Sequence, residues 1–196
     1  MVMRVLENFN WVDYFILIIF LRIIYIAAKK GFTVEFFKFL GVICALYIGM
    51  HYHILVADFI QTSFPFIAKK FPVKFLDFLI FLLLVVLSNL FFVLVKIAFS
   101  YLIKIEAVSL LQKWGGLFLG IFRSVLFAAI FLYGLSISSV SYFEGSVRRS
   151  YLSYRLVSVG IATYRGMWDN IFSKFAPNEQ FNKVVLEVEE NIKIKK

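Results

Sequence analysis

Residues 78–95 read FLIFLLLVVLSNLFFVLV, without a charged side chain, and Lys96 follows directly. A helix needs roughly 20 predominantly apolar residues to cross the hydrocarbon core of a bilayer, with a range of about 17–25. The run is continuous, whereas a strand of a membrane barrel alternates apolar and polar residues over short segments. Its one polar interruption is Ser88-Asn89. This stretch predicts a transmembrane helix and an all-α integral membrane fold.

The composition of the whole chain agrees with a membrane protein. Of its 196 residues, 62% are hydrophobic and 17% are charged, and the mean hydropathy is +0.87. Soluble domains carry about 45–50% apolar and about 25% charged residues, so this chain has too little polar surface to cover itself in water. A soluble enzyme, a disordered chain and a nucleic-acid binder are excluded. The net charge of +9 is better explained by basic residues that flank membrane spans. The single cysteine, Cys44, rules out a disulfide framework.

Three further apolar runs bring the expected number of spans to about four. Residues 36–57 carry Lys38 near one end and are followed by Asp58, and residues 124–143 have Arg123 at their start or inside the helix, depending on where it begins. Residues 11–28 are interrupted by Arg22. A cleaved signal peptide is the rival interpretation of this first run, but an arginine in the apolar region argues against it. We therefore expect a four-span membrane domain over residues 1–143 and an amphipathic, polar C-terminal tail over residues 144–196.

The basic residues divide almost evenly between the two sides of the membrane. One side would carry Lys29, Lys30, Lys38, Lys96, Lys104 and Lys113, and the other Arg4, Lys69, Lys70, Lys74, Arg148, Arg149 and Arg155. The first helix usually dominates orientation, and Lys29-Lys30 follows it. We therefore expect both termini outside the cytoplasm.

Helical periodicity outside the spans predicts three more helices. Tyr101, Ile105, Val108 and Leu111 repeat at helical spacing and predict an interfacial helix before the last span. In the tail, one face is expected to carry Tyr154, Val157, Ile161, Tyr164, Trp168, Ile171 and Phe175, up to Pro177. That face would lie on the membrane, pack on the bundle or bind a partner. A short last helix is expected to carry Phe181, Val185, Val188 and Ile192 on one side.

Ionisable side chains at membrane depth are costly and are often functional. Asp13 begins the first span and is placed to cap its N-terminus. Arg22 can snorkel along the face that carries Tyr25 and Lys29, and Arg123 needs a partner if the last helix starts near Trp114. One alternative treats these three residues as anchors, and the other as a buried pair or polar path, with Arg123 against Asp13 or the Asn89 amide. Asn89 by itself is more typical of contacts between helices.

Small residues recur every fourth position on two spans. Gly116, Gly120, Ser124 and Ala128 form one stripe and Gly41, Ala45 and Gly49 another. Such stripes let helix backbones approach closely. We expect the second and fourth spans to pack against each other, or across a homo-oligomer.

The sequence contains no motif that indicates catalysis or metal binding. Walker, HExxH and GxSxG patterns are absent. His51 and His53 are two residues apart, so on one helix they face apart and are poor joint metal ligands. We therefore expect no catalytic residues, no metal site, no cofactor and no enzyme activity.

Two short signatures resemble the bacterial colicin V production protein (CvpA) family. The first is NWVD at residues 10–13, opening an apolar run, with KKGF at residues 29–32 before the second helix. The second is WGGLFLGIFR at residues 114–123, a glycine-rich helix start with an arginine. The polar tail with Ser150 and Pro177 is also similar, so the resemblance covers roughly residues 10–180.

The resemblance implies a bacterial inner-membrane protein of four spans, associated with colicin V production at or near export and with envelope robustness. It carries over no enzymatic activity. The positions that match the family's pattern are Asp13, Gly31, Phe32, Gly116, Gly120 and Arg123.

Two functional hypotheses follow. The first is an accessory protein for toxin or peptide production or export and for envelope homeostasis, whose partners are the lipid bilayer and either further copies of itself or other inner-membrane proteins, with no nucleic acid. The second is a small oligomeric transporter or channel with a polar path near Arg22, Asn89 and Arg123.

Overall fold

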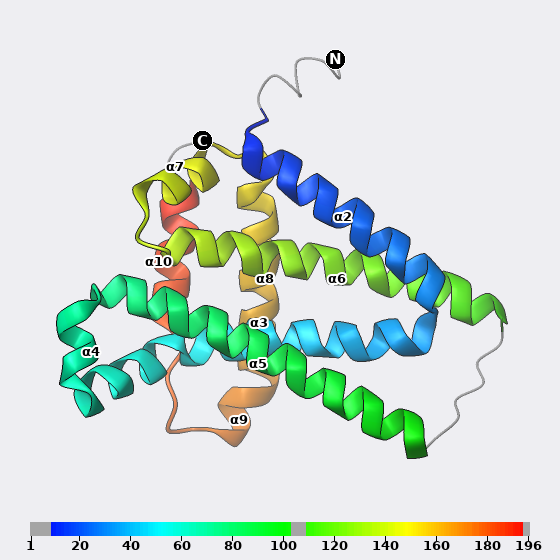
Figure 1. Cartoon of the computed structure of the whole chain (residues 1–196), viewed down its shortest axis with the longest axis horizontal. Helices are drawn as coiled ribbons and strands as arrows, with labels where there is room; N and C mark the ends of the chain where they lie inside the picture. Colours follow the sequence, from blue (N-terminus) through cyan, green and yellow to red (C-terminus); the bar gives the residue numbers. More distant parts are fainter. Residues whose placement is uncertain (1–8, 103–108, 194–196) are drawn as a thin grey trace.

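Four long helices form the membrane domain in the computed structural model, which describes residues 9–102 and 109–193. They are α2 (Trp11–Lys30), α3 (Phe32–Ser63), α5 (Val73–Leu102) and α6 (Ser109–Ile137). Each contains a stretch long and apolar enough to cross a membrane. The described residues are helical or in turns, with no strand, so the all-α four-span fold is confirmed (Figure 1).

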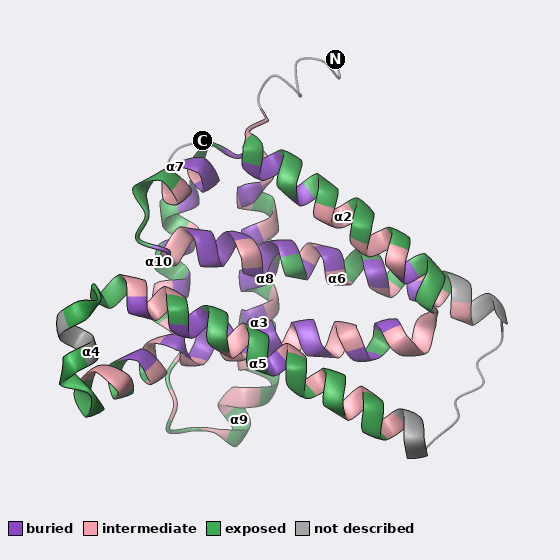
Figure 2. Cartoon of the chain, viewed as in Figure 1, coloured by how far each residue is buried: buried purple, intermediate pink, exposed green. Residues whose placement is uncertain are grey.

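The four helices pack with α3 and α6 at the centre. Within the described residues, α3 packs along α5 and α6, and α2 packs along α6, while α2 and α5 do not pack along each other. Figure 1 shows α2 above and α5 below, both slanting across the central pair. The outer faces of α2 and α5 carry exposed apolar side chains, as lipid-facing surfaces do (Figure 2).

The last span differs from its expected bounds of residues 124–143. Its apolar window begins at Trp114 and the helix ends at Ile137. Ser139 has a φ of 60°, and this left-handed conformation breaks the helix. Phe143 therefore belongs to the next helix, α7 (Ser141–Arg149). Because the span begins at Trp114, Arg123 lies within it.

The expected interfacial helix before the last span is only partly covered by the structure. Tyr101 belongs to the end of α5 and Leu111 to the beginning of α6. Ile105 and Val108 lie outside the described residues.

The second and fourth spans pack against each other, as expected, but the glycines of their small-residue stripes face other helices. Gly116 and Gly120 of α6 face α2 and the turn that follows it, at Gly31 and Ala27. Gly41 and Gly49 of α3 face Phe92 and Phe81 of α5. The glycines of each stripe therefore let one helix of the outer pair approach closely.

The tail folds back onto the membrane domain. Its helices are α7, α8 (Ser153–Met167), a π-helical turn η1 (Trp168–Phe172), α9 (Ser173–Phe175) and α10 (Lys183–Lys193), and a short helix α4 (Pro65–Lys70) lies in the loop between α3 and α5. Figure 1 shows α8 running across α6 and α3 instead of along them. Gly160 permits the crossing, since a Cβ there would lie 2.7 Å from the Ala129 Cβ.

The predicted apolar face of the first tail helix is correct only in its first half. Val157, Ile161 and Tyr164 are buried, but Ile171 and Phe175 are exposed. A π-helical turn inserts one extra residue into the helical repeat. Phe172 takes the place expected for Ile171 and stacks on Tyr47 of α3, with ring centroids 3.8 Å apart. In α10, Val185, Val188 and Ile192 are buried, as the spacing predicted.

Replacing Gly116 with alanine tests the close approach of α2 and α6. The new Cβ would lie 2.8 Å from the Gly31 carbonyl carbon, and backbone cannot move aside cheaply, so we expect a loss of about 1–3 kcal/mol. Gly166→Ala is the matched control, because a Cβ at Gly166 meets nothing within 4 Å. It should gain up to about 1 kcal/mol from helix propensity. Thermal unfolding in detergent micelles measures both, and equal stability of the two variants would contradict this packing.

Candidate functional site

A groove of about 570 Å³ lies between α2 and α5, with α3 and α6 behind it. Its walls are mostly apolar and include Phe15, Ile18 and Ile19 of α2, Phe92 and Val93 of α5, and Phe127 of α6. Ile18 is 65% exposed and Val93 48% exposed. The groove is therefore open sideways, between the two outer helices. Its volume is in the range of small-molecule sites, about 300–1,000 Å³.

Each of the four spans contributes one cationic side chain to this groove. They are Arg22 of α2, Lys38 of α3, Lys96 of α5 and Arg123 of α6. Among the described residues that line the groove, none is acidic. Asn89 also lines it, so the three residues predicted to share a polar path, Arg22, Asn89 and Arg123, do meet in one cavity.

Two of these cations share one buried carboxylate, that of Glu35. Glu35 is fully buried in the first turn of α3, where the positive end of the helix dipole favours a negative charge. Its Oε2 lies 2.8 Å from Arg123 Nη2, and its Oε1 accepts a hydrogen bond of 2.7 Å from Lys38 Nζ. The partner of Arg123 is thus Glu35, in place of the expected Asp13 or Asn89.

Glu35 is the site residue that the sequence-based reasoning missed. It stands three residues before Lys38 near a helix start, which is the usual pattern of an exposed pair at an interface. The available signal was an acidic side chain inside an apolar segment, in a chain where another span carries an unpaired arginine. The partner set could not be chosen from the sequence because it depends on which helices are neighbours.

Arg22 and Asn89 have different surroundings from Arg123. Arg22 is exposed on α2, and no ion pair or hydrogen bond joins its side chain to the described residues. Asn89 donates its amide hydrogen to the Val85 carbonyl of its own helix, at 2.8 Å. Asn89 also lies near Gly41, so it does contribute to a contact between helices.

The two signature segments meet at the turn between α2 and α3. Gly31 has a φ of 79°, in the region that favours glycine. This turn reverses the chain and rests directly on Gly116, while Gly120 admits Ala27. Phe32 begins α3 and stacks on Phe36, with centroids 5.9 Å apart. Glu35 follows one turn later, so the glycine contacts bring α3 close enough for Glu35 to reach Arg123.

Asp13 joins the beginning of α2 to the beginning of the tail. It forms a capping box with Asn10, whose N–H donates to Asp13 Oδ2 at 3.0 Å. Its carboxylate also accepts hydrogen bonds from the Ser150 hydroxyl (2.7 Å) and from the backbone N–H groups of Tyr151 (3.2 Å) and Leu152 (3.0 Å). Asp13 is fully buried. Its capping role was expected, whereas its contacts with the tail were not.

A second polar network holds the end of the tail against α3. The His51 ring lies 2.8 Å from the Tyr164 hydroxyl and 2.9 Å from Glu179, and Asn182 N–H donates to the Tyr164 oxygen. Burial raises the pKa of Tyr164 to about 12, so its hydroxyl keeps its proton. His53 has separate surroundings, with Nδ1 2.8 Å from the Gly49 carbonyl. The two histidines therefore do not face a common site.

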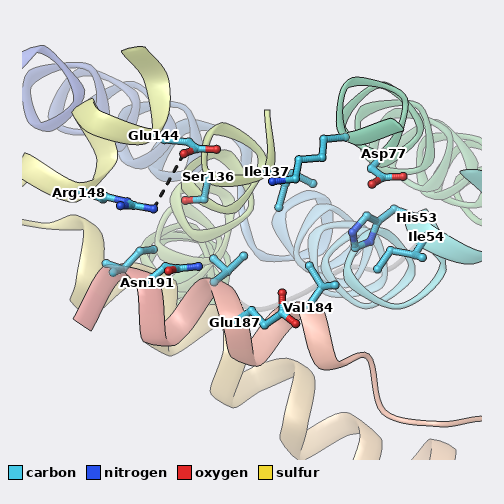
Figure 3. Close-up of a pocket in the computed structure, with 13 residues that line it drawn as sticks. His53, Ile54, Asp77, Ser136, Ile137, Glu144, Arg148, Val184, Glu187 and Asn191 are labelled. Atoms are coloured by element: carbon cyan, nitrogen blue, oxygen red, sulfur yellow. Dashed lines mark ion pairs between the residues drawn. The ribbon is translucent and has the colours of Figure 1, made fainter. Parts of the chain in front are cut away.

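A smaller cavity of about 260 Å³ lies at the opposite end of the bundle, beside α7 and α10. Figure 3 shows His53 and Asp77 on one side, Glu187 and Asn191 of α10 below, and the Glu144–Arg148 pair on the other side. That pair is loose, at 4.0 Å. No group of three or more His, Cys, Asp or Glu side chains suited to a metal ion occurs within residues 9–102 and 109–193.

Four helices are long and apolar enough to cross a membrane, the tail packs on α3 and α6, and a cationic groove opens sideways. Together these features define a multi-pass membrane protein. The chain belongs to the Colicin V production protein family, whose model matches residues 12–161. The matched part contains Asp13, Gly31, Gly116 and Arg123 and ends within α8. No curated protein and no solved structure matches the chain.

Removing the carboxylate of Glu35 should cost more stability than removing any surface charge. Glu35→Gln leaves Arg123 and Lys38 without their shared partner, and breaking a buried ion pair costs about 3–5 kcal/mol. The control is Glu144→Gln, which breaks a half-buried pair worth about 0–1 kcal/mol. Thermal unfolding in micelles gives the difference. The double variant Glu35→Gln/Arg123→Gln should lose less than the sum of the single variants, and strict additivity would show that the pair is not coupled.

Asp13→Ala should release the junction between the bundle and the tail. The Ser150 hydroxyl and two backbone N–H groups lose their acceptor, and each buried unsatisfied group costs about 1–3 kcal/mol. We expect protease cleavage near residues 150–152, mapped by mass spectrometry of the fragments. Asp169→Ala is the control, because Asp169 is exposed and should leave the cleavage pattern unchanged. If Asp13→Ala resisted the protease as well as the unaltered chain does, the hydrogen bonds of Asp13 would not be what holds the tail on the bundle.

Proposed function

We propose that this chain is an accessory protein of the bacterial inner, or cytoplasmic, membrane, which supports the production or export of a colicin V-type toxin peptide and envelope homeostasis. It acts by binding other membrane components and does not catalyse a reaction. Its membership of the Colicin V production family gives the biological context.

The observation that carries the proposal is the sideways-open groove between α2 and α5. A component that stays within the bilayer can enter such a groove without leaving the membrane. The hydrogen bonds of Asp13 and the network around Tyr164 keep the tail against α3 and α6, on the face that lies away from the groove. The groove is thereby left free, and the rigid bundle presents it to the lipid phase.

A second candidate function is the transporter or channel with a polar path. It is favoured by the meeting of Arg22, Asn89 and Arg123 in one cavity. The open side of the groove argues against a closed pore within one chain, so this candidate requires several copies. Ion flux through reconstituted vesicles that is lost in Arg22→Gln would favour it over the accessory role.

Filling the groove tests the accessory function in cells. A bacterial strain that carries a colicin V-type peptide system and lacks its own copy of this protein is complemented with the unaltered chain, with Ile19→Trp or with Leu186→Trp. Ile19 lines the groove, whereas Leu186 lies on α10. We expect Ile19→Trp to lower secreted peptide activity and survival in detergent several-fold, and Leu186→Trp to leave both unchanged.

Immunoblots of the membrane fraction verify that the variants are present in equal amounts. Equal secretion and equal survival with and without the chain would overturn the proposed function. Full activity of Ile19→Trp would show that the groove is not the part of the protein that acts.

A further inference from the structure

We propose that the groove between α2 and α5 binds an anionic phospholipid, with the headgroup phosphate among the cations and an acyl chain along the apolar walls. This inference rests on the proposed function only in using the same groove. It names the occupant, which nothing in the family's description assigns.

Two of the four groove cations have no partner among the described residues. Lys38 and Arg123 share Glu35. Arg22 and Lys96 also line the groove, but neither side chain forms an ion pair or a hydrogen bond with the described residues. An unpaired cation at the centre of a membrane span costs about 2.5–3.5 kcal/mol, and headgroups or another anion lower that cost. The groove therefore holds a surplus of positive charge, which an anionic ligand would neutralise.

Charge is distributed unevenly along the groove. The turn at Gly31, the end of α5 and the start of α6 lie at one end of the bundle (Figure 1). On each helix the cation stands nearer to this end than some of the apolar groove residues: Arg22 is nearer than Ile18 on α2, and Lys96 is nearer than Val93 on α5. Lys38 precedes Val42 on α3, and Arg123 precedes Phe127 on α6. Ile23 and Ile26 continue the wall of α2 past Arg22.

This arrangement matches an amphiphile in both polarity and direction. The cationic end lies on the side of Lys29 and Lys30, the basic pair that closes α2 and marks a membrane interface. A phosphate at that end and a hydrocarbon chain pointing toward Phe15 and Phe127 would have the same direction as a lipid in the surrounding leaflet. Guanidinium and ammonium groups are the side chains that bind phosphate best.

The apolar walls of the groove argue against a water-soluble ligand as its natural occupant. The walls at the far end carry aromatic and aliphatic side chains, and the rims are exposed on the lipid-facing side of α2 and α5 (Figure 2). A free phosphate would leave these walls uncovered. A lipid enters from the bilayer and covers them with its chain.

Native mass spectrometry of the intact chain, released from detergent, tests the proposal with three probes. They are phosphatidylglycerol, which is anionic, phosphatidylethanolamine, which carries a phosphate but no net charge, and inorganic phosphate. We expect a retained phosphatidylglycerol adduct, a phosphatidylethanolamine adduct that is several-fold weaker, and no phosphate adduct. The charge variant is Arg22→Gln/Lys96→Gln, and its matched control is Arg155→Gln/Lys183→Gln, which removes the same charge from the tail.

The charge variant should bind phosphatidylglycerol at least about tenfold more weakly, since each basic residue near an anionic lipid contributes about 1 kcal/mol and 1.4 kcal/mol is tenfold. The tail control should stay within about twofold of the unaltered chain. Ile19→Trp, which fills the groove without changing its charge, should lose the adduct as well. Circular dichroism shows whether the variants keep their helices.

Three results would overturn the proposal: equal binding of the two lipids, an unchanged adduct in the charge variant, or binding of inorganic phosphate alone. Because this measurement uses the purified chain, it is independent of peptide secretion. Lipid binding without a secretion defect in the deletion strain would support the lipid site and reject the accessory role. A secretion defect without lipid binding would support the accessory role and reject the lipid site.

Discussion

The ion pair between Glu35 and Arg123 is the interaction on which the arrangement of the spans depends. Both charges lie within helices that cross the membrane, and each would be costly there without the other. Their separation of 2.8 Å fixes the distance and rotation of α3 relative to α6. Because α3 also packs on α5, and α6 on α2, this contact between the two central helices also influences where both outer helices lie.

The glycines of the two signature segments make that ion pair possible. Gly31 reverses the chain in a conformation that other residues rarely adopt, and Gly116 lets the turn rest on the backbone of α6. At the other end of α2, the carboxylate of Asp13 holds the chain that enters α8. The first helix is thus tied at both ends, by close backbone packing at one and by hydrogen bonds at the other, while its middle remains free to line the groove.

Features that depend on one helix at a time were predicted from the sequence, and features that depend on neighbouring helices were not. The four spans and the buried face of α10 follow from apolar length and helical period. Glu35 as the partner of Arg123 and the pairing of the small-residue stripes with α2 and α5 depend on which helices meet. The register shift at η1, which packs Phe172 on Tyr47 and exposes Ile171, arises from one extra residue in a turn and leaves no periodic signal.

The four groove cations illustrate why burial and function must be separated for charges in a membrane. Lys38 and Arg123 are held by the fold, because both bind Glu35, whose single negative charge offsets one of their two positive charges. Arg22 and Lys96 are not needed by any interaction that holds the bundle, yet both lie on the inner rim of the same cavity. Charges that only anchored helices would lie at the helix ends, as Lys29 and Lys30 do. Arg22 lies inside the first span and Lys96 near the end of the third, and both line the same groove, where an anionic ligand would offset their charge.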